Sequence, residues 1–211
     1  MESEKLRIFD EKGKFVGVET RREVHKKGYW HETFHFWLVE RVEGVEYIYF
    51  QLRSEHKKDY PDLLDITAAG HILATETVED GIREVKEEIG IDVSMEELHS
   101  LGVIPYTNVH HDLIDRELAH VFLLVRKYDM EDFLLQPEEV SGMARIKLDD
   151  MILMWEGKLE QVEATGFKMD SDGERAEWNE PLKKEHFVQH EDHFYLKTFA
   201  RIKKALEESS D

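Results

Sequence analysis

Polar and apolar residues alternate along much of the chain, which is the pattern of β-strands that bury one face. The alternation is most regular from Glu32, where every second residue is large and apolar: Phe34, Phe36 and Leu38. The strands expected from this pattern are 5–10, 15–18, one starting at 32, 45–52, 64–69, 101–109, 117–126, 142–148, 161–167 and 176–178. Glycine-containing turns at 11–14 and 43–44 predict hairpins between the first four of them.

Three stretches repeat apolar residues at helical spacing instead. Val78, Ile82, Val85 and Ile89 predict a helix over 77–89, which Gly90 would end. Further helices are expected over 149–155 and 192–208. Strands alternating with a few helices indicate a mixed α/β fold. Because no repeat or linker interrupts the chain, we expect one domain over 1–211, with N-terminal strands (1–28), a core (29–155), and a hairpin insertion with a C-terminal helix (156–211).

The polar face of the helix expected over 77–89 is acidic. Glu84, Glu87 and Glu88 stand at positions i, i+3 and i+4, so their carboxylates project from one face and repel each other. A hard divalent cation would turn that repulsion into coordination, because Mg²⁺ prefers oxygen ligands and bridges carboxylates to phosphates. A solvated amphipathic helix with no ligand is the simpler alternative, and spacing alone leaves both open.

The stretch from Gly70 to Ile91 also resembles a Nudix box, whose pattern is G, five residues, E, seven residues, then R-E-apolar-x-E-E-x-G-apolar. The residues that match are Gly70, Glu76, Arg83, Glu84, Val85, Glu87, Glu88, Gly90 and Ile91. Two features depart from the pattern. Only six residues separate Glu76 from Arg83, and Thr75 stands where a second glycine often lies.

This resemblance implies a Nudix-type α/β/α sandwich with a mixed sheet, followed by a C-terminal hairpin and helix. It implies a metal-dependent hydrolase that cleaves the diphosphate linkage of a nucleoside diphosphate derivative or other organic diphosphate. Mg²⁺ (or Mn²⁺) would be bound by Glu84, Glu87 and Glu88, and Arg83 would hold these glutamates in place. A catalytic base outside the box is expected at Glu117 or Glu139, and we prefer Glu117. Glu84, Arg83, Glu87 and Glu117 are therefore the expected catalytic residues.

Segments on both sides of the box resemble a second family, the isopentenyl-diphosphate isomerases, which are built on the same fold. The matching positions are His25, His31, His71, Asp115 and Glu117, which in that family form a metal site. The catalytic cysteine of the isomerases would fall at Ala69. Because that thiol is missing and the hydrolytic glutamates are present, hydrolysis is favoured. The five residues form either a second metal site or a hydrogen-bonded structural cluster, and an isomerase or a non-catalytic diphosphate-binding domain stays an alternative.

Two loops carry residues of types that bind ligands. The loop 53–60 carries Arg53, Lys57 and Lys58, which are expected either to hold anionic substrate oxygens or to be solvated. The tip 170–173 contains two aspartates and a glycine but lacks the ligand spacing of an EF-hand. It is expected to be a hairpin tip and not a calcium site.

Charge and composition narrow the partners. The 211 residues include 47 acidic and 28 basic ones, a formal charge of −19. Such a charge repels nucleic acid and anionic membranes, so neither is expected as a partner. The absence of cysteine excludes disulfides and a thiol nucleophile. No apolar run is long enough to span a membrane and the N-terminus lacks an apolar signal core, so a cytoplasmic location is expected. The expected partner is a small diphosphate substrate, and a homodimer stays open.

Overall fold

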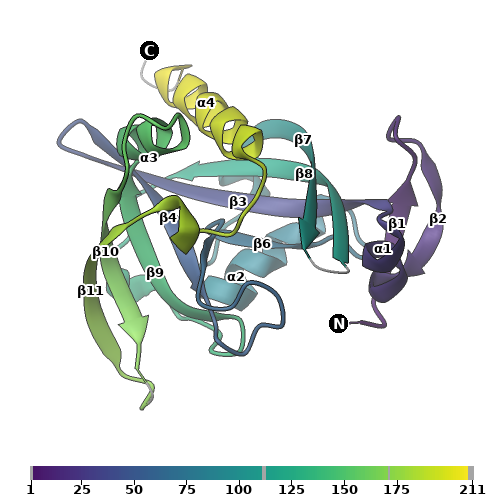
Figure 1. Ribbon diagram of the computed structural model, residues 1–211, viewed down its shortest axis with the longest axis horizontal. Coiled ribbons are helices and arrows are strands. Elements are labelled where there is room, and N and C mark those ends of the chain that lie inside the picture. Colours follow the sequence, from purple (N-terminus) through teal and green to yellow (C-terminus); the bar gives the residue numbers. More distant parts are fainter. Residues whose placement is uncertain (1, 111–112, 171, 209–211) are drawn as a thin grey trace.

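The computed structural model describes residues 2–110, 113–170 and 172–208 as a mixed sheet with helices on both faces (Figure 1). Its eleven described strands are β1 (Lys5–Phe9), β2 (Phe15–Thr20), β3 (Trp30–Val42), β4 (Val45–Arg53), β5 (Leu64–Asp65), β6 (Ala68–His71), β7 (His99–His110), β8 (Leu113–Val125), β9 (Val140–Lys147), β10 (Val162–Met169) and β11 (Arg175–Leu182). The helices are α1 (Arg21–Lys27), α2 (Arg83–Ile89), α3 (Leu148–Trp155) and α4 (Asp192–Glu208), with short 3₁₀ turns η1 (Glu79–Ile82), η2 (Met95–Glu97), η3 (Met130–Asp132) and η4 (Lys184–His186).

The long strand β3 lies at the centre of the sheet. The main path runs β11-β10-β9-β4-β3-β1-β2, and β3 also pairs with β6 and, in parallel, with β8. The hairpins expected at β1–β2 and β3–β4 are confirmed, as is the C-terminal hairpin β10–β11. One parallel pair among antiparallel ones makes the sheet mixed, as expected.

Both faces of β3 are buried, and each belongs to a different apolar core. Phe34 and Phe36 pack with Val85 and Ile89 of α2 on one face. Trp37, on the other face, packs in the core that includes the apolar stripe of α4. The expected division of β3 residues between two faces is therefore confirmed, and it separates an α2 face from an α4 face of the sheet.

The helix expected over 77–89 begins later than predicted. Residues Glu79–Ile82 form the 3₁₀ turn η1, and the α-helix runs only from Arg83 to Ile89. The Asp80 carboxylate accepts bonds from both the backbone N–H and the hydroxyl of Thr77, which fixes a turn before the helix. Gly90 ends α2 at a φ of 75°, as predicted.

The strand expected over 64–69 is divided in two. Thr67 lies between β5 and β6, where its hydroxyl donates to the Tyr49 carbonyl and accepts from the Leu38 N–H. These side-chain bonds replace ladder bonds at the break. The second piece, β6, continues to His71, two residues beyond the predicted end.

Helix α1 was not predicted, because the segment 1–28 was expected to contain strands only. The Thr20 hydroxyl accepts from the Glu23 N–H at its start, and Gly28 ends it at a φ of 64°. Both cap residues were readable in the sequence, but seven residues give too little periodicity to show a helix.

The other elements differ from expectation mainly in length. Strand β7 starts at His99 and β8 at Leu113, both earlier than predicted, and α4 has the predicted bounds. Residues 111–112 of the predicted β7–β8 connection and Ser171 of the predicted hairpin tip lie outside the described residues. Among the helices that the structure describes, none combines the length and apolar character needed to cross a membrane.

Candidate active site

Helix α2 lies over strand β6 and presents two of its glutamates to the strand backbone. Glu88 is 7% exposed, and its Oε2 accepts from the Ala69 N–H and from Gln51 Nε2, both at 3.0 Å. A Cβ at Gly70 would collide with the Glu84 carboxylate, so any larger residue there would displace this side chain from its place over the strand. Glu87 is about half exposed and points to solvent. The three predicted metal ligands therefore share one face of α2, as their spacing predicts.

Arg83 connects the glutamates of the helix with the loop before it. Its Nε donates to Glu76 Oε1 at 2.8 Å, and its Nη1 donates to Glu84 Oε1 at 2.6 Å and to Glu87 Oε2 at 3.1 Å. Its Nη2 also donates to the His71 carbonyl at 3.2 Å. The shortened linker after Glu76 thus does not prevent the contact with Arg83. These charge-assisted bonds fix the positions of the carboxylates.

The two glutamates nearest the sheet hold protons unusually well. Burial raises the pKa of Glu84 to about 7, with Arg83 opposing the rise and Glu87 adding to it. Burial likewise raises the pKa of Glu88 to about 8, with the Glu84 carboxylate adding to the rise. A divalent cation would favour the ionised form of both groups. Among the described residues, only the histidine-containing groups have ligand atoms that all lie within 4.8 Å of one another, so Mg²⁺ or Mn²⁺ would have to draw these three carboxylates together.

A second cluster lies where α1 meets the sheet. The rings of His25, His31 and His71 lie with centroids 5.1 Å apart in every pair. His25 Nδ1 donates to the Arg21 carbonyl at 2.9 Å and His31 Nδ1 donates to the Tyr29 carbonyl at 3.1 Å. Since a carbonyl only accepts, the Nε2 atoms of these rings carry lone pairs when the rings are neutral. Histidines that bind a metal through one ring nitrogen typically donate the N–H of the other ring nitrogen to a carbonyl or carboxylate, as Nδ1 of these two rings does.

Two carboxylates complete this cluster. Asp115 Oδ1 lies 3.5 Å from His25 Nε2 and 3.4 Å from His31 Nε2. Both Asp115 Oδ1 and His31 Nε2 are buried without a hydrogen-bond partner. One ligand atom each from His31, Asp115 and Glu117 lies within 4.8 Å of the others, and the same holds for the three histidines. Burial holds the pKa of His71 well below its usual value, so this ring is neutral. Imidazole and carboxylate donors with unpaired buried atoms fit a divalent transition metal.

Glu117, which we preferred as the base of the glutamate site, belongs to this second cluster. Its Oε2 accepts from the Thr33 hydroxyl at 2.6 Å and lies 2.9 Å from His35 Nε2. Both partners lie on the α4 face of β3, whereas α2 covers the opposite face. The structure therefore brings Glu117 together with the histidines and not with Glu84, Glu87 and Glu88.

Ala69, which takes the place of the isomerase cysteine, also faces the α4 side. It pairs with His35 across the β6–β3 ladder and packs against the core under α4. Phe194 of α4 contacts that region, with its ring 5.7 Å from His35 and 4.4 Å from Tyr106. Phe194 and Ala69 therefore belong to the same apolar core under α4.

The three predicted substrate-binding cations lie in different surroundings. Arg53 donates to Asp65 Oδ2 at 2.9 Å and to the carbonyls of Asp59 and Tyr60, which organises its own loop. Lys58 is exposed and pairs with Glu2.

Lys57 lies closest to the glutamate site. It is paired with Glu139, and its charge opposes the rise of the pKa of Glu88. Glu139 follows a turn in which the Gln136 N–H donates to the Glu88 carbonyl. Lys57 and Glu139 are thus the predicted residues from outside the box that lie near α2.

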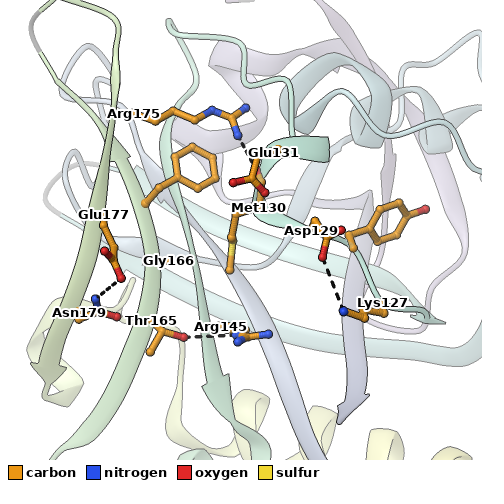
Figure 2. A pocket seen from close by; sticks show the side chains of 12 residues that line it. Lys127, Asp129, Met130, Glu131, Arg145, Thr165, Gly166, Arg175, Glu177 and Asn179 are labelled. Atoms are coloured by element: carbon orange, nitrogen blue, oxygen red, sulfur yellow. Dashed lines mark hydrogen bonds and ion pairs between the residues drawn. The ribbon is translucent and has the colours of Figure 1, made fainter.

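A groove of about 540 Å³ lies elsewhere, between the loop after β8 and the hairpin β10–β11 (Figure 2). Arg175 stacks on Phe167 there, and Arg145 bonds to Thr165 and to the buried Glu40. The described residues that line it include none of the predicted site residues. It is therefore separate from both clusters.

Sequence patterns did not identify two contact residues, Gln51 and His35. Gln51 lies in an ordinary strand pattern, and its role depends on the distant Glu88. His35 stood out only as a polar residue on one face of β3, and its partner Glu117 is 82 residues away. The register between β3 and β8 pairs Glu117 with His31, and the Glu117 carboxylate reaches His35 on the same face of the sheet.

The sheet lies between helices, and a loop and a helix that carry glutamates lie over one of its strands. This arrangement of fold and site defines the class of protein. A family model described as the NUDIX domain matches residues 32–169. A relative from Clostridium acetobutylicum, an uncharacterized Nudix hydrolase, is 40% identical over 195 residues, which cover 92% of this chain and 95% of the relative. The chain belongs to the Nudix hydrolase family, whose members are pyrophosphohydrolases that typically use divalent metals.

More distant relatives agree with both resemblances. Nudix hydrolase 3 of Arabidopsis thaliana is 31% identical over 156 residues, which cover 71% of this chain but only 20% of that protein. An isopentenyl-diphosphate Delta-isomerase of Photobacterium profundum is 29% identical over 123 residues, 57% of this chain and 67% of the isomerase.

Solved structures agree on the fold. A crystal structure from Deinococcus radiodurans has a TM-score of 0.51 at 20% identity, and covers 71% of this chain and 86% of that chain. A MutT/nudix family protein from Enterococcus faecalis has a TM-score of 0.50 at 12% identity, and covers 82% and 62%. The Nudix α/β fold with a mixed sheet and a C-terminal helix is confirmed.

Proposed function

We propose that this protein is a divalent-metal-dependent hydrolase that cleaves the diphosphate linkage of a nucleoside diphosphate derivative or another organic diphosphate. The observation that carries the proposal is the set of Glu84, Glu87 and Glu88 on one face of α2, held by Arg83. Bound Mg²⁺ or Mn²⁺ would neutralise the diphosphate and make hydroxide available near neutral pH.

The protein's own residues would bind and orient the reactants. Arg83 holds Glu84 and Glu87 so that their carboxylates do not turn away from the cation. Lys57, whose charge acts on Glu88, would hold a phosphate oxygen at the edge of the glutamate site. Water attacks one phosphorus, the bond from that phosphorus to the bridging oxygen breaks, and the other phosphate leaves with this oxygen, while one proton of the water passes to a carboxylate. Glu139, paired with Lys57, is the carboxylate we assign to this role in place of Glu117.

The test is product release from a panel of organic diphosphates with Mg²⁺, compared between the wild type and Glu87→Gln. Because Glu87 is about half exposed, its substitution should leave the fold intact and lower turnover by orders of magnitude. Glu163→Gln removes one exposed charge on β10 and serves as the matched control. Equal turnover of Glu87→Gln and wild type at saturating Mg²⁺ would contradict the metal assignment. No hydrolysis of any member would favour a diphosphate-binding domain.

We further propose that His25, His31, His71, Asp115 and Glu117 hold a second divalent metal. The supporting observation is the pair of buried, unpaired atoms His31 Nε2 and Asp115 Oδ1. If these residues instead served an isomerase, isopentenyl diphosphate would be converted to its allylic isomer. Ala69 lacks the thiol for that proton transfer and Phe194 packs nearby, so we expect no conversion. Metal analysis of the purified protein and of His31→Ala tests the second site directly.

A further inference from the structure

Glu88 is the most constrained of the three helix glutamates, and both of its described bonds involve one oxygen. Oε2 accepts from the Ala69 N–H of β6 and from Gln51 Nε2 of β4, each at 3.0 Å. Among the described residues, none bonds to Oε1. The carboxylate therefore keeps one oxygen for the protein and leaves the other for a ligand.

Gln51 is itself held in place. It lies in the middle of the sheet, paired with Asp65 of β5 and Met143 of β9, and it is 3% exposed. A side chain confined in this way loses little freedom when it donates to Glu88. The bond connects α2 to β4.

The chemical type of the donor matters as much as its position. A lysine or arginine at residue 51 would neutralise Glu88 and compete with a cation. A carboxylate there would repel Glu88, and an apolar residue would leave Oε2 with one donor in a buried site. A neutral amide orients the carboxylate and preserves its charge for the metal.

We infer that Gln51 is a positioning residue for the glutamate metal site, where it fixes Glu88 so that Oε1 faces the bound cation. This inference rests on the proposed function, because it requires a cation at Glu84, Glu87 and Glu88. Gln51 does not touch substrate or metal. Groups that orient a metal ligand in this way typically contribute a factor of about 10 to 100 in metal affinity.

The experiment is a titration of the protein with Mn²⁺, in which free Mn²⁺ is followed by electron paramagnetic resonance. The site followed is the one that Glu87→Gln removes, which excludes the histidine cluster. Gln51→Met keeps the length of the side chain and removes its N–H donors. We expect this variant to bind Mn²⁺ about 10- to 100-fold more weakly. Turnover at saturating Mn²⁺ should stay near that of the wild type, because the substitution weakens Mn²⁺ binding and a saturating concentration fills the site again.

Two further variants separate positioning from general stability. Thr198→Val replaces a buried polar side chain on α4, away from the glutamates, and should bind Mn²⁺ as the wild type does. Gln51→Asn keeps the amide but is one methylene too short, so it should bind Mn²⁺ weakly even if the methionine variant does not fold.

The outcomes distinguish this inference from the proposed function. Wild-type affinity in a folded Gln51→Met or Gln51→Asn variant would overturn the positioning role and leave the metal site standing. A wild type with no Mn²⁺ site that depends on Glu87 would overturn the proposed function, and this inference with it.

Discussion

Arg53, Lys57 and Lys58 show how far residue type alone predicts a role. Arg53 ends β4 and the two lysines follow it in the loop, and among the main causes of the Glu88 pKa shift only Lys57 is one of the three. Arg53 is bonded within its own loop and Lys58 pairs with Glu2 at the surface. The sequence gives charge and approximate location, but the direction of each side chain depends on the loop backbone.

We predict that Lys57→Met raises the KM for the diphosphate substrate about tenfold or more, whereas Lys58→Met leaves it within about twofold. A charge-assisted bond to a phosphate oxygen contributes roughly 1.5–3 kcal/mol, and its loss appears in substrate binding. Steady-state kinetics on both variants provides the check, with Lys58→Met as the matched control. Equal KM values for the two variants would contradict a role for Lys57 in binding.

At the scale of elements, the four-residue strand β6 lies between the two candidate sites. Gly70 makes room for Glu84 on the α2 face, while Ala69 and His71 face the α4 side with His35 and Thr33. A strand alternates its side chains, so one short segment can serve both sites. The box motif in the sequence predicted α2 and its glutamates from local spacing. It did not predict the separation of Glu117 from them, because that depends on the pairing of β3 with β8.

We predict that Ala69→Cys gains no isomerase activity and keeps most of its diphosphate hydrolysis. The new thiol would lie beside His35, in the same apolar core as Phe194. Conversion of isopentenyl diphosphate to its allylic isomer, followed by chromatography, is the measurement. Conversion by the variant or by the wild type would rank isomerisation above diphosphate hydrolysis and contradict this prediction.

At the scale of the whole molecule, acidic groups dominate, with a formal charge of −19. The composition predicted repulsion of polyanions but could not show which carboxylates are buried. Glu88 is 7% exposed, and only the packing of α2 on β4 and β6 reveals it. Its raised pKa couples the stability of the fold to pH.

We predict that the metal-free protein loses stability relative to Glu88→Gln as pH rises from about 5 to 8. The folded pKa of Glu88, about 8, lies above its ordinary value of 4.5, so the folded state binds the extra proton in this window. The stability that Glu88 contributes by holding this proton is fully present below its pKa in the unfolded state. It is lost as pH rises through its pKa in the folded state. The expected slope of the difference is on the order of 1 kcal/mol per pH unit. Urea unfolding with a chelator present measures it, and added Mg²⁺ should reverse the trend. A pH-independent difference would contradict the burial of an ionisable Glu88.

The most direct test of the central claim is to locate the metal itself. Crystals grown with Mn²⁺ and measured for anomalous scattering should show a peak about 2 Å from carboxylate oxygens of Glu84, Glu87 and Glu88. A second peak among His25, His31 and His71 is compatible with this result. A peak only at the histidines, with none at the glutamates of α2, would contradict the assignment of the hydrolytic site.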